Sequence, residues 1–282
     1  MDTLVLSSFQ SWKEALPLDG KPIPVHFVPT MGALHDGHGA LIRAARQKAG
    51  DLGHVVVSVY VNPTQFNDAG DLSAYPRTQD ADVILARRFG ADAVVFPTSE
   101  EMYPEGVPAQ VAVSDYGALT QRWEAAHRPG HFDGVVAVVR TLFEATKPTC
   151  AYFGEKDWQQ LAVIRRLAKL EFPALDIVAV PTVREPGGLA MSSRNARLSD
   201  VDRQGATALH SALNAVVQSG GDGSEVDVQR ARLNALGFGV EYLAVVDAET
   251  LEPGCAPNRG GRVIVAAHWA GVRLIDNAPL AG

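Results

Sequence analysis

The sequence predicts an α/β fold, with a doubly wound parallel sheet followed by a smaller α+β domain that has antiparallel strands. Up to about residue 185, β-branched apolar runs alternate with segments whose apolar residues recur at helical spacing, the pattern of a parallel sheet covered by helices. Beyond Arg197, two amphipathic helical patterns are followed by closely spaced strand patterns, as in an α+β unit. We therefore expect one domain over residues 1–185 and a second over 186–282, with the boundary near Gly187.

Five strands are predicted in the first domain because each run is apolar and β-branched residues are frequent. They cover residues 24–28, 54–61, 91–96, 150–153 and 176–180. Helices are predicted where apolar residues recur every three or four positions. They run from a cap at Ser7 or Ser8 to Leu16, from Gly39, over 78–89, over 134–146 and after Asp157. The segment 97–128 is predicted as loops with a short helix and a short strand at 111–113.

The second domain begins with two predicted helices. Ser199 is expected to cap the first, with Asp202 at its third position, and the second covers 225–236 and ends at Gly237. Three strands follow over 240–246, 262–269 and 272–275, the last two joined by a tight turn at residues 270–271.

Composition narrows the functional classes. The 282 residues are 46% hydrophobic and 20% charged, which is ordinary for a globular protein with a sizeable core. The formal net charge of −7 argues against broad binding to nucleic acid or anionic membranes. Cys150 and Cys255 form no metal-binding or redox pair in sequence, which favours a reducing cytoplasm. The N-terminus lacks a signal-peptide pattern, and no apolar run reaches the roughly 18 residues that cross a membrane.

Residues 29–38, Pro-Thr-Met-Gly-Ala-Leu-His-Asp-Gly-His, follow the first predicted strand and precede a predicted helix. Unpaired backbone N–H groups at a helix start carry the positive end of the peptide dipoles, so such a turn favours an anion, phosphate above all. Its glycines let a ligand approach the backbone, and His35 and His38 add donors that titrate near neutral pH. The turn predicts a phosphate site, although two histidines standing alone are more often ordinary loop residues.

Two further loops place cationic and hydroxyl side chains after predicted strands. Gly-Glu-Lys-Asp at 154–157 supplies Lys156 and Asp157, and Met-Ser-Ser-Arg at 191–194 supplies two hydroxyls and Arg194. Lysine and arginine bind phosphate oxygens, and a carboxylate accepts hydrogen bonds from ribose hydroxyls. Each loop alone is more typical of a solvated turn or a helix cap. Because open α/β sheets bind ligands at the carboxyl edge of their strands, the loops together predict one pocket.

Familiar nucleotide and metal signatures do not occur in the sequence. It contains neither G-x-x-x-x-G-K-[ST] nor G-x-G-x-x-G, and no His-Glu-x-x-His. Magnesium is expected with the triphosphate of a nucleotide, since it usually binds substrate phosphates and one or two carboxylates. Asp80 and Asp82 are candidate ligands, but acidic residues in the first turn of a helix are more simply partners of its dipole, and we assign no protein metal ligand.

Six motifs occur in order along nearly the whole chain. They are residues 29–38, 61–66 (Val-Asn-Pro-Thr-Gln-Phe), 75–78 (Tyr-Pro-Arg-Thr), 153–160 (Phe-Gly-Glu-Lys-Asp-Trp-Gln-Gln), 191–195 (Met-Ser-Ser-Arg-Asn) and 273–277 (Arg-Leu-Ile-Asp-Asn). Together they resemble the pantothenate synthetase family, the ATP-dependent pantoate–β-alanine ligases. The His-x-Gly-His element alone is shared with other nucleotidylyltransferases and class I aminoacyl-tRNA synthetases, so by itself it indicates only adenylyl transfer.

The resemblance implies a Rossmann-like domain that binds ATP and pantoate, a smaller C-terminal lid domain, and a homodimer with its contact in the larger domain. It implies that the pantoate carboxylate attacks the α-phosphorus of ATP, leaving pyrophosphate and an enzyme-bound pantoyl adenylate. The amine of β-alanine then attacks the activated carbonyl to give pantothenate and AMP. ATP, pantoate and β-alanine are the expected substrates, with Mg²⁺ carried by the triphosphate; neither nucleic acid nor a membrane is an expected partner.

The resemblance also implies roles for individual residues. The expected ATP site comprises Met31, Gly32, Ala33, Leu34, His35, Asp36, Gly37, His38, Gly154, Glu155, Lys156, Asp157, Val183, Met191, Ser192, Ser193 and Arg194. Of these, His38, His35, Lys156 and Arg194 are the expected catalytic residues, with His38 as the proton donor. Gln65 and Gln160 would bind pantoate, because neutral amides suit both its hydroxyls and its carboxylate, and β-alanine would enter next to Gln65.

One position departs from the family's pattern. In Gly-His-Phe-Asp-Gly at 130–134, Asp133 stands where arginine or a small residue is common, and its charge would oppose ATP if it faced the phosphates. We expect Asp133 to cap the following helix instead, and place neither it nor His131 in the site. Two alternatives remain open: a nucleotidylyltransferase acting on a phosphorylated substrate, and a nucleotide-sensing binding protein with a degenerate site.

Overall fold

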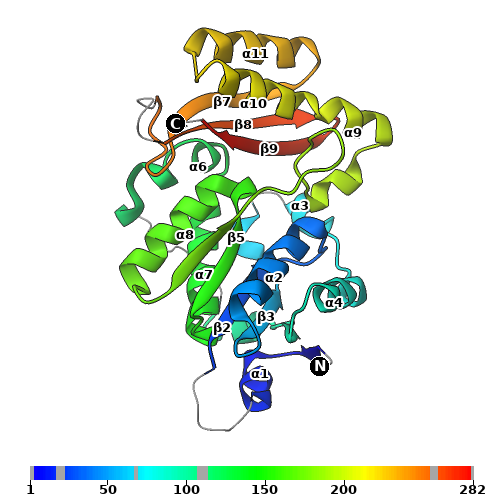
Figure 1. The fold of residues 1–282 in the computed structure, drawn as a ribbon, viewed down its shortest axis with the longest axis vertical. Coiled ribbons are helices and arrows are strands. Elements are labelled where there is room, and N and C mark those ends of the chain that lie inside the picture. The colour runs from blue at the N-terminus through cyan, green and yellow to red at the C-terminus, as the bar shows by residue number, and fades with distance from the viewer. Residues whose placement is uncertain (1–2, 17–22, 67–68, 107–113, 255–259, 281–282) are drawn as a thin grey trace.

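Two β-sheets, one above the other in Figure 1, organise the chain. The structure, a computed structural model, describes residues 3–16, 23–66, 69–106, 114–254 and 260–280. The larger sheet is six-stranded and parallel with helices on both faces, and the smaller is three-stranded and antiparallel. The predicted fold class is therefore confirmed. The strand predicted at 111–113 and Cys255 lie outside the described residues.

The large sheet has the strand order β1-β4-β3-β2-β5-β6. Its strands are β1 (Leu4–Leu6), β2 (Val25–Thr30), β3 (His54–Val59), β4 (Ala93–Val95), β5 (Cys150–Gly154) and β6 (Asp176–Val180). The sequence does not predict β1, because three residues on the sheet edge, paired only with β4, are too short for a recognisable pattern. The central strand β2 lies between β3 and β5, so the order reverses there, and such a switch point is where open sheets bind ligands.

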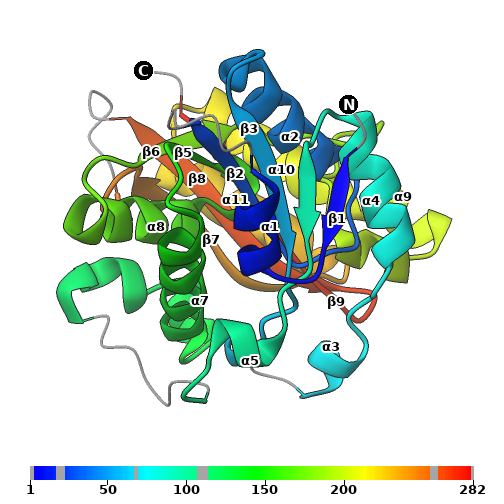
Figure 2. The ribbon, with the colours of Figure 1, turned by 90° about the horizontal axis from the view of Figure 1, so that it is seen from below.

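Helices cover both faces of the large sheet (Figure 2). Along β3, Val55 and Val57 face a core shared with α2 (Asp36–Ala49) and α4 (Gln79–Arg88). Val56 faces the opposite core, to which α1 (Phe9–Ala15), α7 (His131–Thr146) and α8 (Trp158–Glu171) contribute side chains. The short helices are α3 (Ala69–Ser73), α5 (Ser99–Met102) and α6 (Glu124–His127), with 3₁₀ turns at Pro63–Gln65, Ser114–Thr120, Glu155–Asp157 and Ser193–Arg197.

Two helices begin earlier than their apolar pattern indicates. α2 starts at Asp36, so the predicted anion-binding turn itself supplies the first helical turn. α7 starts at His131, directly after Gly130, whose backbone is left-handed (φ 77°). The prediction that Asp133 caps this helix is wrong, because Gly130 occupies the cap position. Asp133 lies in the first turn, where its charge still suits the helix dipole.

The small sheet consists of β7 (Gly239–Asp247), β8 (Gly261–Trp269) and β9 (Val272–Pro279). The predicted turn between β8 and β9 is confirmed, and both of its residues, Ala270 and Gly271, have positive φ. One face of this sheet packs against the helices α9 (Asp200–Ala206), α10 (Ala208–Gln218) and α11 (Gly223–Ala235). Its other face joins the core of the large sheet.

The helices that pack on the small sheet follow the predicted pattern, except that one predicted helix is divided in two. Ser199 caps α9, as predicted, and its hydroxyl accepts a hydrogen bond from the Asp202 N–H at 3.1 Å. The single helix predicted here is two, α9 and α10, which meet at Thr207. Among the described residues, no helix has both the length and the apolar character needed to span a membrane.

Candidate active site

The turn between β2 and α2 is held by a buried carboxylate. Gly32 and Ala33 both have positive φ (84° and 50°), which reverses the chain after β2. The oxygens of Asp82, in the first turn of α4, accept hydrogen bonds from the N–H groups of Ala33 (3.2 Å) and Leu34 (2.8 Å). Asp80, by contrast, is exposed. Asp82 therefore supports the loop backbone. The sequence suggests a magnesium ligand or a partner of the helix dipole, and neither interpretation includes this role.

The two predicted histidines cap α2. Nδ1 of His35 accepts a hydrogen bond from the Gly37 N–H at 3.1 Å, and Nδ1 of His38 accepts one from the His35 N–H at 3.2 Å. A Cβ at Gly37 would lie 2.8 Å from the His35 ring, so this position requires glycine. A neutral imidazole that accepts through Nδ1 carries its proton on Nε2.

Both histidines are neutral near pH 7. Burial lowers the pKa of His35 to about 4 and the pKa of His38 to about 3, and the positive charge of Lys156 acts in the same direction. The rings lie 4.1 Å apart and both line the same cavity. The turn therefore presents two Nε2–H donors to a ligand rather than two positive charges.

The second strand-to-helix turn, residues 154–157, follows β5. Lys156 is largely buried, and its Nζ lies 3.7 Å from a carboxylate oxygen of Asp157. Gln160, in the first turn of α8, lines the same cavity. This turn is held from the small sheet, because the side-chain amide of Asn277 in β9 donates hydrogen bonds to the backbone carbonyls of Glu155 and Lys156.

The loop after β6 forms the third wall. The Met191 N–H donates to the Val183 carbonyl at 3.0 Å, which brings the two ends of the loop together. The Ser192 hydroxyl accepts a hydrogen bond from the Arg194 N–H at 3.3 Å and caps the following 3₁₀ turn. Arg194 thus lies on a short, capped segment at the cavity.

These three walls bring most of the predicted site residues together. The cavity is lined by Met31, His35, Gly37, His38, Gln65, Gly154, Lys156, Asp157, Gln160, Val183, Met191, Ser192, Ser193 and Arg194. The predicted ATP-binding residues that do not line it are Gly32, Ala33, Leu34, Asp36 and Glu155. The N–H groups of Ala33 and Leu34 are bound to Asp82, and the Glu155 carboxylate accepts a hydrogen bond from Arg262 at 2.8 Å.

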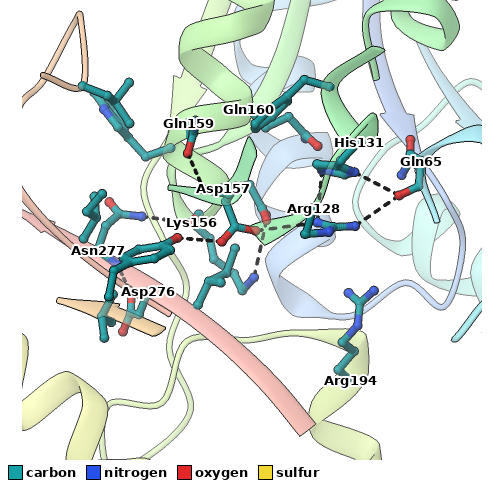
Figure 3. A pocket seen from close by; sticks show the side chains of 18 of the residues that line it. Gln65, Arg128, His131, Lys156, Asp157, Gln159, Gln160, Arg194, Asp276 and Asn277 are labelled. Atoms are coloured by element: carbon teal, nitrogen blue, oxygen red, sulfur yellow. Dashed lines mark hydrogen bonds and ion pairs between the residues drawn. The ribbon is translucent and has the colours of Figure 1, made fainter. Parts of the chain in front are cut away.

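A second hollow, the one drawn in Figure 3, adjoins the first. Gln65 and Gln160 line both hollows. In the second hollow, Nη2 of Arg128 and Nδ1 of His131 donate hydrogen bonds to the Gln65 carbonyl, at 3.2 and 2.9 Å. Burial lowers the pKa of His131 to about 4, so this ring is also neutral, and its Nε2 accepts from Arg128 at 3.1 Å. The backbone of Gln65 is therefore fixed from two sides.

Comparisons with known proteins establish the family. The family model described as pantoate-beta-alanine ligase matches residues 5–279. A pantothenate synthetase from Acidothermus cellulolyticus is 49% identical over 266 residues, which cover 91% of this chain and 86% of the relative. The chain belongs to the pantoate–β-alanine ligase family. Another pantothenate synthetase, from Thermus thermophilus, is 47% identical over 278 residues, 96% of this chain and 97% of the relative.

Solved structures of this ligase family have the same fold. A crystal structure of pantothenate synthetase from Thermus thermophilus has a TM-score of 0.90 at 43% identity and covers 99% of this chain and 100% of its own. A pantoate–β-alanine ligase from Francisella tularensis, complexed with β-γ ATP and β-alanine, has a TM-score of 0.81 at 31% identity, with 98% and 97% covered. The reaction of this protein is accordingly the ligation of pantoate to β-alanine.

Sequence reasoning missed several residues of this ligase site. It set His131 aside together with Asp133, and it named neither Arg128 nor Asn277. A usable signal existed for Arg128 and His131: they lie three residues apart on either side of Gly130, just ahead of an apolar helical pattern, a position that brings polar side chains to the N-terminal end of that helix. The role of Asn277 depends on how two sheets pack, so only its motif was visible.

Proposed function

We propose that this ligase works through an enzyme-bound pantoyl adenylate, with ATP, pantoate and β-alanine as substrates. In the first step a pantoate carboxylate oxygen attacks the α-phosphorus, the bond from that phosphorus to the β-phosphate oxygen breaks, and pyrophosphate leaves. In the second step the β-alanine amine attacks the acyl carbon, the acyl–oxygen bond to AMP breaks, and the nitrogen loses a proton. The observation that carries the proposal is the convergence of anion-binding and amide side chains on one cavity.

In the proposed ATP site, the phosphates bind the Nε2–H groups of His35 and His38 together with Lys156 and Arg194. Phosphoryl transfer depends chiefly on positioning and on preorganised donors aimed at developing charge, which these four groups supply. His38 donates a hydrogen bond to the phosphate group on which negative charge increases during the first step. The remaining roles follow the family pattern: Ser192 and Ser193 at the phosphates, Gly154 and Asp157 at the ribose, Val183 at the adenine edge, and Met31, Gly37 and Met191 along the walls.

Magnesium enters this proposal as part of the substrate MgATP. Within the described ranges, no group of three or more His, Cys, Asp and Glu side chains could hold a metal ion. The carboxylate of Asp82, one of the two candidate ligands, already accepts the N–H groups of the first turn. Magnesium commonly keeps several waters and binds phosphates with few protein ligands, so a site of this kind suits the metal–nucleotide complex.

Pantoate binds between Gln65 and Gln160 in the proposed arrangement. Their neutral amides can donate to a carboxylate and accept from hydroxyls without cancelling the charge of the nucleophile. β-Alanine approaches next to Gln65 through the second hollow, where the guanidinium of Arg128 offers charge-assisted hydrogen bonds to its carboxylate. The two hollows share Gln65 and Gln160 and also Lys156 and Arg194, so the amine reaches the acyl carbon next to the proposed phosphate site.

We further propose that residues 1–185 form the catalytic domain, that residues 186–282 act as a lid, and that the enzyme is a cytoplasmic homodimer. The two separate sheets support the division, and the family resemblance supports the dimer. Sedimentation equilibrium should give twice the mass of one chain, and a monomer mass would contradict the dimer. An ATP-bound structure in which residues 186–282 stay remote from the nucleotide would contradict the lid.

The adenylate route is tested by exchange of labelled pyrophosphate into ATP. Exchange should require pantoate and should proceed without β-alanine, because only the first step is involved. Exchange that requires a phosphorylated substrate instead would favour the alternative nucleotidylyltransferase, and ATP binding without turnover would favour a nucleotide sensor. Pantoate labelled with ¹⁸O in its carboxylate should transfer label to AMP, and unlabelled AMP would rule out the adenylate.

A further inference from the structure

The Arg-Leu-Ile-Asp-Asn motif at 273–277 has no role in the reaction as described so far. In the structure it lies in β9, and its polar side chains reach different parts of the large domain. Arg273 binds Glu124 of α6 at 2.6 Å, Asp276 binds Arg184 of the third wall at 2.6 Å, and Asn277 reaches the turn that carries Lys156. Of these contacts, that of Asn277 is closest to a residue proposed to bind phosphate (Figure 3).

The amide of Asn277 is buried and fully oriented. Asn277 is 4% exposed, and its Nδ2 donates to the carbonyls of Glu155 (2.9 Å) and Lys156 (2.8 Å). Its Oδ1 accepts a hydrogen bond from Nε of Arg262 at 2.6 Å. Since both carbonyls can only accept and the guanidinium can only donate, the orientation of this amide is determined.

Arg262, from the neighbouring strand β8, holds the same amide by a hydrogen bond. It is 5% exposed, its Nη2 donates to the Glu155 carboxylate at 2.8 Å, and its guanidinium carbon lies 3.4 Å from the centre of the Trp158 ring. The two strands therefore hold the turn through its backbone and through the side chains on either side of Lys156. Groups fixed in this way lose little freedom when a ligand binds, which is the condition for accurate positioning.

We propose that Asn277 is a positioning residue for adenylate formation, which acts by fixing the backbone of Lys156. The small sheet thereby completes the phosphate site in addition to any lid movement. The inference rests on the proposed phosphate-binding role of Lys156. A misplacement of about 1 Å at a reacting group can cost on the order of 10²-fold in rate, so loss of this support should be visible in the first step.

The decisive variant is Asn277→Asp. Its carboxylate keeps the acceptor for Arg262 and the size of the side chain, but it cannot donate to the two carbonyls. We expect pantoate-dependent pyrophosphate exchange to slow by about 10- to 100-fold at saturating pantoate. Asn277→Ala removes the donors without adding a charge and should slow exchange to a similar extent. An exchange rate within twofold of wild type in both variants would overturn the proposal.

A Lys156→Ala background separates positioning from a general structural role. If Asn277 acts through Lys156, adding Asn277→Asp to Lys156→Ala should slow exchange by less than threefold further, because effects of groups that act as a unit are not additive. The same fold-loss in both backgrounds would overturn the proposal. If Lys156→Ala alone leaves exchange unchanged, the assigned role of Lys156 fails first, and the proposal fails with it.

Trp269→Phe is the matched control. Nε1 of Trp269, in β8, donates to the backbone carbonyl of Asp202 at 2.8 Å, so this variant also removes a side-chain donor to a carbonyl in the small domain. Its exchange rate should stay within twofold of wild type while its thermal unfolding shifts as much as that of Asn277→Ala. A rate loss equal to that of Asn277→Ala would show that any weakening of the small domain suffices, and would overturn the proposal.

Discussion

The two strand-to-helix turns of the site are held by opposite chemistry. In the turn after β2, the carboxylate of Asp82 accepts hydrogen bonds from backbone N–H groups. In the turn after β5, the amide of Asn277 donates hydrogen bonds to backbone carbonyls. Asp82 lies 49 residues from its partner Ala33 and in the same sheet unit, whereas Asn277 lies 121 residues from Lys156 and in the other sheet.

The two turns therefore depend on different parts of the protein. The first turn needs only β2, α2 and α4, which all belong to the large sheet and its helices. The second also has the small sheet docked against it, through Asn277 on the 3₁₀ turn Glu155–Asp157 and Arg273 on α6. The large sheet and its helices thus hold the two histidine donors by themselves, whereas the turn of Lys156 is also held by a contact from the small sheet.

Removing a donor of the first turn should have the largest effect on rate. His38→Ala deletes an Nε2–H that is already in place before the reaction, so adenylate formation should slow by about 10²–10³-fold. Pantoate-dependent pyrophosphate exchange measures this step directly. A rate within twofold of wild type would show that the first turn contributes position without a catalytic donor.

Acid should weaken the contact between Glu124 of α6 and Arg273 of β9, which helps to dock the small sheet against the second turn. Burial alone would raise the pKa of Glu124, but the hydrogen bonds and charge of Arg273, with the hydrogen bond of Tyr242, lower it from 4.5 to about 2. The folded-state value lies below the unfolded one, so the stabilisation is present above about pH 4.5 and is lost as the pH falls towards 2. It amounts to roughly 3 kcal/mol, the worth of a shift of this size.

Denaturant unfolding at pH 7 and pH 3 measures this loss. Glu124→Gln, which keeps a hydrogen-bonding side chain without the titrating carboxyl, should be less stable than wild type at pH 7 and should lose less stability on acidification. Equal acid dependence of the two proteins would mean that the Glu124–Arg273 ion pair does not stabilise the contact between the small sheet and α6.

Changing Asp82, which holds the backbone of the first turn, should slow adenylate formation less than deleting the His38 donor does. In Asp82→Asn, one acceptor oxygen becomes an NH₂ group that faces a backbone N–H, which destabilises by about 1–3 kcal/mol and should slow adenylate formation by about 10-fold. Asp80→Asn, on the exposed side of the same helix, should change neither property. If both variants behave alike, Asp82 supports α4 and has no special role in the turn.

The most limited effect is expected next to the second turn, at Gln160, because only the binding of pantoate should change. Gln160→Ala removes one amide from the junction of the two hollows, so the KM for pantoate should rise by about 10-fold, the scale of one hydrogen bond of about 1.5 kcal/mol, with ATP affinity unchanged. Isothermal titration with each substrate separates the two affinities. Equal loss for ATP and pantoate would place Gln160 in the support of α8 rather than in a pantoate site.

Local patterns were sufficient for much of this molecule. The apolar, β-branched run at 54–61 predicted β3, whose Val55, Val56 and Val57 are fully buried, and the apolar spacing of α2 and α7 located both helices within a few residues. The ordered motifs indicated the family, and His35, His38, Lys156 and Arg194 do line one cavity. Such features are visible in sequence because each depends on neighbours within a few positions.

The sequence by itself therefore determined the fold class, the strand-to-helix turn that carries His35 and His38, and the family. Only the tertiary structure decided which side chains hold the backbone of these segments. Asp82 accepts hydrogen bonds from the turn after β2, and Asn277 donates to the turn that carries Lys156. Arg128 and His131 donate to the carbonyl of Gln65. These contacts join a side chain to a backbone group in a distant segment. A backbone N–H or carbonyl is present at almost every residue, so nothing in the sequence marks which one a distant side chain will meet.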